Sequence, residues 1–316
     1  RDRALVALMA DGPFRERLDA RDVRTVVLQE AASMQRVRRE SGMPGPGAVG
    51  AVLATARAVG RLARDYDLLY ANSQKAFIVG CVAAVFARKP VLWHLHDILD
   101  PGVFSRINIG VDVFLANFVA TRVIANSQAT AAALRARGGT RARVDVVYNG
   151  LDRALFAAVT DGQTTALRAA LGLGNAPVIG LFGRIAPWKG QHIAIRALGL
   201  LGSDSEAHLL IVGDALFGEE SYAAEVRELV AQLGLASRVH FLGFRTDVPV
   251  LMRAVDVLVH TSTAPEPFGR VIAEGMLAER PVIATAGGGA SEIVQPGVTA
   301  WQVQAGDPVA LASAIR

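Results

Sequence analysis

Cysteine, lysine and long apolar runs are all scarce in this sequence of 316 residues. The single cysteine, Cys81, excludes an internal disulfide and predicts a reducing, cytoplasmic setting. Because Cys81 lies in the apolar segment FIVGCVAAVF, we interpret it as an inert core thiol. The apolar stretches are too short and interrupted to cross a bilayer, which takes about 20 residues. Only three lysines occur, Lys75, Lys89 and Lys189, so each marks a position where a compact ammonium charge is of interest.

Charge is divided unevenly along the chain. Residues 1–150 carry 21 Lys and Arg against 13 Asp and Glu, a net +8, while residues 151–316 carry 12 against 16, a net −4. A basic first half favours an anionic partner, such as phosphates or an acidic membrane face. Its basic residues are scattered and have no aromatic residues between them, which argues against a nucleic-acid partner. Peripheral contact of this half with an anionic membrane is therefore a hypothesis, and scattered solvated arginine is the simpler reading.

Apolar strand-like runs alternate with helical stretches throughout the chain. We predict strands at 4–10, 24–29, 67–72, 91–96, 122–127, 143–149, 177–184, 207–214, 238–244, 255–262 and 281–285, and helices near 48–64, 74–88, 111–120, 128–138, 189–200, 220–234, 247–254 and 268–279. This alternation is typical of parallel sheets with helices on both faces. The polar segment 159–165 breaks the pattern and is read as part of the domain link. The chain is therefore predicted to form two doubly wound α/β domains, residues 1–152 and 153–316, with a cleft at the carboxyl ends of their strands.

Three motifs are read as decoys. GPGAVG (45–50) matches the dinucleotide fingerprint but follows no strand, so it predicts a loop and helix start, and a nicotinamide dehydrogenase is only a third hypothesis. DYD (65–67) resembles a metal motif but precedes a strand, so its carboxylates would face away from the cleft. His94 and His96 share one face of a strand but lack an evident third metal ligand, which favours hydrogen-bonded, half-buried histidines.

A pair of cations follows the strand at 177–184. In GRIAPWKGQ (183–191), Arg184 and Lys189 stand at the carboxyl end of the strand, where a helix begins. Arginine offers a forked contact and lysine a point charge, and helix amides add positive potential. The segment is therefore a candidate diphosphate clamp, although two surface cations in a loop would look the same.

Two glutamates flank the start of the helix predicted at 268–279. In EPFGRVIAE, Pro267 suits the first helical position, so the amides of Phe268 to Val271 are expected as free donors. The rise of a helix predicts that the carboxylates of Glu266 and Glu274 lie roughly 10–12 Å apart. That is too far for a carboxylate pair at one scissile bond but suits the two ends of a nucleoside diphosphate sugar.

Three consecutive glycines occur in TAGGGASEI (285–293), after the strand predicted at 281–285. Glycines there would let the backbone approach a ligand closely. The simpler reading is a flexible turn followed by a helix that Ser291 caps.

These segments together resemble the donor domain of the retaining glycosyltransferases of family 4, which have the GT-B fold. Further stretches agree with the resemblance: HLHD (94–97), VYNGLD (147–152), LLIVGD (209–214) and HFLGF (240–244). It extends from about residue 4 to the end of the chain. The resemblance implies an N-terminal acceptor-binding domain over 1–152 and a C-terminal donor-binding domain over 153–316, both Rossmann-like.

The resemblance also implies a role for each matching residue. Arg184 and Lys189 would bind the donor diphosphate, together with the backbone at Phe268, Gly269, Arg270 and Val271. Glu274 would hold the ribose, and Gly243, Phe244 and Arg245 would contact the base. His96 and Glu266 would act at the transferred sugar, with His94 as the alternative histidine.

Activity follows from the same resemblance. A hexosyl group would pass from a nucleotide diphosphate sugar, UDP- or GDP-linked, to an acceptor hydroxyl with retention of configuration. The acceptor would be a small molecule, a lipid-linked sugar or a glycan. Neither a metal nor another cofactor is implied, because Arg, Lys and helix dipoles would take the leaving-group charge. The alternative is a protein of the same fold that binds nucleotide sugars without turnover.

Three departures from the family pattern stand out. The opening strand with its glycine-rich loop and the closing helix that returns to the first domain are not found in this chain, which is the reason for the alternative above. Gly275 and Glu279 stand where the family often has Ala and Gly. This last departure, at Gly275 and Glu279, is expected to tune a turn.

Overall fold

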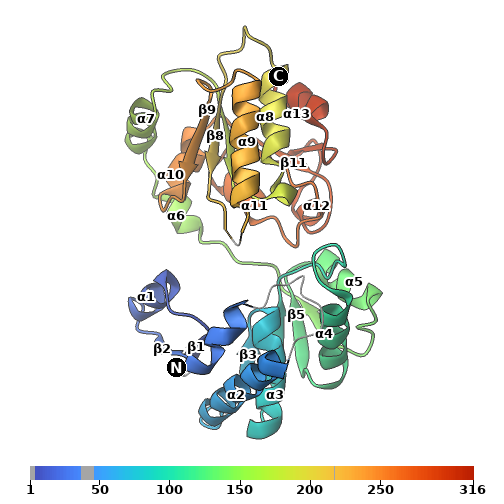
Figure 1. Cartoon of the computed structure of the whole chain (residues 1–316). Coiled ribbons are helices and arrows are strands. Elements are labelled where there is room, and N and C mark those ends of the chain that lie inside the picture. Colours follow the sequence, from blue (N-terminus) through green and yellow to red (C-terminus); the bar gives the residue numbers. More distant parts are fainter. Residues whose placement is uncertain (1–3, 37–45, 217) are drawn as a thin grey trace. The chain divides into compact units, whose positions relative to one another are not determined.

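The computed structural model describes residues 4–36, 46–216 and 218–316. The chain divides into two compact units, residues 1–148 and 149–316, which we call unit 1 and unit 2 (Figure 1). This division falls a few residues before the predicted boundary after residue 152.

Unit 1 alternates strands and helices, as predicted. Its elements are β1 (Leu5–Leu8), α1 (Pro13–Asp19), β2 (Arg24–Val27), a 3₁₀ helix (Gln29–Arg36), α2 (Pro46–Ala63), β3 (Leu69–Ala71), α3 (Gln74–Ala87), β4 (Val91–Leu95), α4 (Arg106–Phe118), β5 (Arg122–Ala125), α5 (Gln128–Ala136) and β6 (Val144–Val146). Strands β1 and β2 pair in parallel, and β3, β4, β5 and β6 form a parallel sheet in chain order.

Serine caps set the starts of three helices in unit 1. The side chains of Ser73, Ser105 and Ser127 accept hydrogen bonds from backbone amides in the first turns of α3, α4 and α5. Each serine follows a strand by a few residues or ends a loop, so the local sequence switches the chain from extended to helical backbone.

Unit 2 is a larger α/β unit. Its elements are α6 (Arg153–Ala157), α7 (Asp161–Ala170), β7 (Val178–Phe182), a 3₁₀ turn (Pro187–Lys189), α8 (Gln191–Leu200), β8 (His208–Val212), α9 (Glu220–Gln232), β9 (Val239–Gly243), α10 (Val248–Ala254), β10 (Val257–His260), α11 (Arg270–Leu277), β11 (Val282–Thr285), α12 (Ala290–Ile293), β12 (Trp301–Val303) and α13 (Pro308–Ile315).

The six strands of unit 2 form a parallel sheet in the order β12-β11-β10-β7-β8-β9. Every residue of β7 is buried, as expected for a central strand with both faces covered. Ile179 and Leu181 pack in a core with residues of α8, α9 and α13, while Val178 and Phe182 pack in a second core with residues of α10 and α11. Figure 1 shows α8 and α9 on the face of the sheet that carries the first of these cores.

Two local predictions are wrong. The segment 159–165 is not an irregular link but opens α7, where Thr160 and Gln163 form a capping box that starts the helix. The helix predicted at 268–279 begins only at Arg270, because Gly269 has a left-handed backbone with φ +92°. Pro267 therefore precedes the helix and is not its first residue.

GPGAVG, as far as the structure describes it, is the start of α2, which begins at Pro46. Gly45 and the residues before it back to 37 lie outside the described ranges. The described part of the motif is thus helical, in line with the prediction of a helix start.

Candidate functional site

The candidate site lies where the strand order of unit 2 reverses. The chain enters the sheet at β7, continues outward through β8 and β9, and then returns to the other side of β7 with β10 and β11. In open parallel sheets, ligands bind at the carboxyl ends of the strands at such a switch point. The loops after β7 (183–190) and after β10 (261–269) both begin at this edge, and they carry Arg184, Lys189 and Glu266.

Gln191 holds the loop after β7 from within. Its buried side-chain amide donates to the Arg184 carbonyl at 2.9 Å, and its carbonyl oxygen accepts from the Ala186 amide at 3.4 Å. Because Gln191 opens α8, the loop that carries both predicted clamp cations is fastened to a helix of the core.

The two loops are fastened to each other as well. The Thr261 hydroxyl donates to the Lys189 carbonyl at 2.8 Å, and the Thr263 amide donates to the Trp188 carbonyl at 2.8 Å. Gly190 makes this approach feasible, since a Cβ there would lie 2.1 Å from the Thr261 carbonyl oxygen. Gly190 also has φ +68°, a backbone conformation that disfavours other residues. Lys189 is therefore placed by main-chain contacts on both sides.

Lys189 forms an ion pair with Glu266 across the two loops. The ammonium contacts Oε1 of the carboxylate and lies 4.3 Å from the centre of the Trp188 ring. The side chains of Lys189 and Glu266 are 19% and 8% exposed, so the pair is largely removed from water. Each group thus compensates the charge of the other where neither would be stable alone.

Two further groups reach the same carboxylate oxygen. The Ser262 hydroxyl donates to Glu266 Oε1 at 2.8 Å, and the His260 Nε2 atom lies 3.2 Å from it. Burial raises the pKa of Glu266, but the hydrogen bond from His260 and the charge of Lys189 outweigh it and hold that pKa at about 2. Glu266 is therefore ionised at any physiological pH.

Arg184 is placed differently from Lys189. Its side chain is 26% exposed, and Nε lies 3.8 Å from Glu219 Oε2. Glu219 is the residue before α9, so this ion pair links the loop after β7 to the start of that helix.

The start of α11 follows Glu266 by a few residues in the chain. The amides of Arg270 and Val271 are the first two of the helix and have no acceptor within it. With the helix dipole they form a site that favours negative charge. Phe268 and Gly269 precede the helix, so the expected run of four helical amides is reduced to two.

Glu266 precedes α11 and Glu274 lies within it, as the sequence predicts, and the separation of roughly 10–12 Å between their carboxylates stays a prediction. Glu274 lies within α11 and accepts a hydrogen bond from Arg270 Nη2 at 3.0 Å. Burial raises the pKa of Glu274, and the Arg270 charge opposes that rise. Its side chain is 17% exposed, so it remains open to a further donor.

The glycine loop after β11 packs against the segment of Glu266. A Cβ on Gly288 would lie 2.2 Å from the Glu266 carbonyl oxygen, and one on Gly289 would lie 2.4 Å from that of Pro267. The Gly289 amide donates to the Glu266 carbonyl at 2.7 Å. Gly288 and Gly289 are therefore required by the close approach of the protein's own backbone, and the approach of this loop to a ligand stays a prediction. Ser291 is not a helix cap, since its hydroxyl accepts from the Gly287 amide within the loop.

The predicted base-binding residues lie at the end of β9, on the same edge of the sheet. Gly243 has φ +62° and its carbonyl accepts from the Gly213 amide at 2.9 Å. Phe244 is 70% exposed. Arg245 donates to both carboxylate oxygens of Asp247, at 2.8 and 2.6 Å, which orients its guanidinium. An exposed ring and an oriented guanidinium form a surface on which a planar base can stack.

His94 and His96 belong to unit 1, at the end of β4. His96 donates from Nε2 to Asn72 Oδ1 at 2.6 Å, and His94 Nδ1 contacts the Tyr70 hydroxyl. Burial lowers the pKa of both, to about 4 for His94, where His96 adds to the effect. Both are hydrogen-bonded and half-buried, as predicted.

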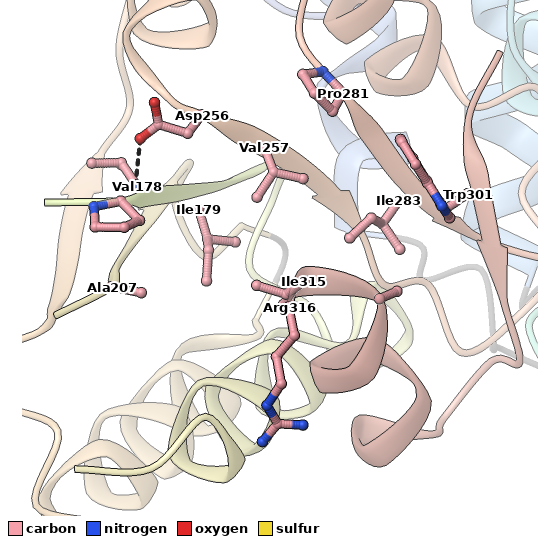
Figure 2. Close-up of a pocket in the computed structure, with 12 residues that line it drawn as sticks. Val178, Ile179, Ala207, Asp256, Val257, Pro281, Ile283, Trp301, Ile315 and Arg316 are labelled. Atoms are coloured by element: carbon pink, nitrogen blue, oxygen red, sulfur yellow. Dashed lines mark hydrogen bonds between the residues drawn. The ribbon is translucent and has the colours of Figure 1, made fainter. Parts of the chain in front are cut away.

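A pocket of about 370 Å³ lies at the opposite edge of the unit 2 sheet. Figure 2 shows it at the starts of β7 and β10, between Pro281, Trp301 and the end of α13. Its charged lining residues are Asp256 and Arg316, and Asp256 accepts a hydrogen bond from the Val178 amide at 2.7 Å. The pocket is mostly apolar and lies away from the carboxyl ends of the strands, so it is separate from the candidate site.

Metal ligands, membrane-spanning helices and the single cysteine complete the set of candidate features. In the part of the chain that the structure describes, no group of three or more His, Cys, Asp or Glu side chains could hold a metal ion. None of the described helices is long and apolar enough to cross a membrane. Cys81 is buried, and burial with the charge of Asp112 raises its pKa to about 12, which fits an inert core thiol.

Sequence reasoning missed three residues of the site: His260, Ser262 and Thr285. All three are buried and hydrogen-bonded around Glu266 or one another. The apolar pattern predicts His260 to Ser262 only as the end of the strand at 255–262. The available signal was a histidine within the apolar run VDVLVH, which is an unusual place for a titratable group.

Fold and site together define a class of protein. Two α/β units with parallel sheets, and candidate anion-binding groups at a switch point in the second, are features expected of the GT-B fold.

Comparisons with known proteins agree. The model of Glycosyltransferase Family 4 matches residues 6–155, and that of Glycosyl transferases group 1 matches residues 176–316. The crystal structure of Anabaena Alr3699/HepE in complex with UDP-glucose is 44% identical over 99% of this chain and 81% of that one, with a TM-score of 0.88. Sucrose-phosphate synthase from Thermosynechococcus elongatus is 25% identical over 92% of this chain and 72% of that one, with a TM-score of 0.76. The chain therefore belongs to glycosyltransferase family 4 and has the GT-B fold.

Curated relatives are matched over a shorter region. D-inositol 3-phosphate glycosyltransferase of Mycolicibacterium gilvum is 35% identical over 176 residues, which is 55% of this chain and 38% of that protein. The chain thus matches less than half of the length of that relative.

Proposed function

We propose that this protein is a retaining glycosyltransferase that moves a hexosyl group from a nucleotide diphosphate sugar to an acceptor hydroxyl. The observation that carries the proposal is the buried Lys189–Glu266 pair at the switch point of unit 2. A cation and an ionised carboxylate side by side match a ligand with a diphosphate next to a sugar. The complexes of the Anabaena relative with UDP-glucose, with UDP, and with UDP and glucose favour a uridine nucleotide as donor.

Each residue of the site then has a role. Arg184 and Lys189 bind the diphosphate, with the amides of Arg270 and Val271. Glu266 accepts hydrogen bonds from the hydroxyls of the transferred sugar, and Glu274 accepts from the ribose. The base lies against Gly243, Phe244 and Arg245, and His96 of the N-terminal domain acts at the sugar.

Leaving-group charge is taken up by the protein itself in this proposal. As the bond between sugar and diphosphate breaks, negative charge grows on the diphosphate, and fixed cations and amides nearby stabilise it. The Arg184 guanidinium, the Lys189 ammonium and the first amides of α11 supply that stabilisation without a metal ion or another cofactor.

The acceptor hydroxyl belongs to a small molecule, a lipid-linked sugar or a glycan, and it attacks the sugar from the face that the diphosphate leaves. The basic charge of residues 1–150 supports peripheral contact with an anionic membrane. A cytoplasmic setting is supported by the single cysteine, which needs no oxidising compartment. Co-sedimentation with anionic vesicles that weakens with salt would support membrane contact, and salt-independent binding or none would contradict it.

Calorimetric titration with UDP-glucose tests the proposal. Lys189→Ala and Glu274→Ala each remove a charged hydrogen-bond partner of the donor, which typically contributes about 1.5–3 kcal/mol, so the affinity should fall roughly 10- to 150-fold. Lys89→Ala in unit 1 is the matched control and should bind as the wild type does. A thermal-shift screen of UDP and GDP sugars identifies the donor, because a bound ligand raises the melting temperature. Unchanged affinity in both site variants would contradict the proposal.

A further inference from the structure

His260 lies at the centre of a buried chain of polar groups. The residue is 6% exposed and ends β10. Its Nδ1 atom lies 3.2 Å from the Thr285 hydroxyl, and its Nε2 atom lies 3.1 Å from the Ser262 hydroxyl and 3.2 Å from Glu266 Oε1. Both ring nitrogens therefore have polar neighbours at hydrogen-bond distance.

The Thr285 hydroxyl cannot donate to the ring without losing its other bond. It lies 2.9 Å from the Ser262 carbonyl oxygen, which can only accept. A hydroxyl has one hydrogen, and the carbonyl takes it. Thr285 Oγ1 then has only lone pairs left for His260, so Nδ1 must carry a proton and donate it.

The same reasoning applies on the other side of the ring. The Ser262 hydroxyl donates its hydrogen to Glu266 Oε1 at 2.8 Å, and a carboxylate can only accept. The neighbours of Nε2 are thus the lone pairs of Ser262 Oγ and of the carboxylate oxygen. A bare Nε2 would face both without a hydrogen, so Nε2 must also donate.

We propose that His260 is held as an imidazolium cation and acts as a positioning residue, which fixes the Glu266 carboxylate together with Lys189. The charged groups that act on Glu266 are Lys189 and His260, and Ser262 and Thr285 complete the chain as neutral groups. The trio of Lys189, Glu266 and His260 then has a net charge of +1, which suits an anionic ligand.

This arrangement leaves one carboxylate oxygen for the ligand. Lys189, Ser262 and His260 all converge on Oε1 of Glu266. Oε1 thus anchors the carboxylate, and Oε2 presents its lone pairs to a sugar hydroxyl. This last step rests on the proposed function, whereas the protonation of His260 does not.

NMR of the unliganded protein labelled with ¹⁵N-histidine tests the protonation directly. The six histidines are distinguished by the signals that are lost in His260→Gln. At pH 8 an exposed histidine is neutral, since its ordinary pKa is about 6.5. We expect both nitrogens of His260 to show the shifts of an imidazolium at that pH. The shifts of a neutral tautomer would overturn the proposal.

Thr285→Val provides a second variant. Valine keeps the shape of threonine but cannot accept from Nδ1, so the imidazolium loses a partner and the His260 signals at pH 8 should move toward the neutral form. Thr55→Val is the matched control, because Thr55 is also fully buried but lies in α2 of unit 1, where its hydroxyl donates to the Ala51 carbonyl. Identical His260 signals in Thr285→Val and in the wild type would contradict the proposed chain.

UDP-glucose binding separates the positioning role from the protonation. His260→Gln keeps a neutral donor but no charge, and its affinity should fall about tenfold, as for one lost charged hydrogen bond. Wild-type affinity in this variant would refute the positioning role. A wild-type protein that shows the imidazolium but binds no nucleotide sugar would refute the proposed function and leave the protonation standing.

Discussion

The Lys189–Glu266 ion pair should be strongly coupled in folding. We consider Lys189→Met, Glu266→Gln and the double variant. Methionine keeps the apolar stem over the Trp188 ring, and glutamine keeps the shape of the carboxylate, so the cycle mainly removes charge. The pair is largely buried, with exposed fractions of 19% and 8%. Removing one partner of a buried pair typically costs about 3–5 kcal/mol.

Expected values follow from what each variant leaves behind. In Lys189→Met the carboxylate keeps Ser262 and His260, which lowers the expected cost to about 3 kcal/mol. In Glu266→Gln the ammonium can turn toward solvent, and the cost should be about 2 kcal/mol. The double variant leaves no unpaired charge between the two positions and should cost about 3 kcal/mol, which gives a coupling of about 2 kcal/mol.

Urea unfolding measures these values when the signal comes from unit 2 alone. The protein has three tryptophans, of which Trp93 lies in unit 1 and Trp188 and Trp301 lie in unit 2. All variants therefore carry Trp93→Phe, so that fluorescence reports only the unit with the ion pair. This avoids a two-state fit to two units that unfold separately.

A control cycle uses the pair of Arg253 and Glu279, whose atoms lie 3.4 Å apart and whose carboxylate is largely in water, with side chains 19% and 73% exposed. Its coupling should stay below about 1 kcal/mol. Additive costs for Lys189 and Glu266, within about 0.5 kcal/mol, would refute the reasoning, because they would mean that the buried charges do not depend on each other.

Three further predictions concern acid and two backbone positions. The pKa of Glu266 is lowered from 4.5 to about 2, so the ionised carboxylate stabilises unit 2 above pH 4.5, and this stabilisation is lost as the pH falls toward 2. The loss should be about 3 kcal/mol in urea unfolding of the wild type and should be missing in Glu266→Gln. Gly190→Ala should destabilise unit 2 by about 3 kcal/mol or more in urea unfolding, since its Cβ would overlap the Thr261 carbonyl. Gly202 also has positive φ but lies in open space, so Gly202→Ala should cost only about 1–2 kcal/mol in the same measurement. Glu279→Gly should raise stability by up to about 1 kcal/mol, because Glu279 has φ +59°; a lower urea midpoint would contradict this.

Much of the architecture was predictable from local pattern. All strands predicted between residues 4 and 285 occur, because buried parallel strands are short apolar runs bounded by turns. The start of α7 was missed although its capping box, Thr160 and Gln163, is legible in the sequence. The start of α11 was placed too early, because Pro267 fits a first helical position and only the backbone shows that Gly269 is left-handed. The backbone likewise shows that Glu279 has a left-handed conformation, for which glycine is best suited.

Candidate site residues divide in the same way. Arg184, Lys189 and Glu266 could be selected from the sequence because charged residues follow apolar strands at the edge where ligands bind. Their mutual contacts could not, since Lys189 and Glu266 stand 77 residues apart and meet only because β7 and β10 are neighbours in the sheet. The sequence left the glycine loop open between a ligand-binding segment and a flexible turn, and only the structure shows that Gly288 and Gly289 approach the Glu266 segment.

By itself, the sequence determined the family, the two α/β units and the residue types of the candidate site, because apolar periodicity and charged residues at the ends of strands are local properties. Only the tertiary structure decided that Lys189 and Glu266 form one buried pair and that His260, Ser262 and Thr285 complete it. The physical reason is burial: once these groups leave water, each must find its hydrogen-bond partner in another strand or loop, and sheet order decides which partners are within reach.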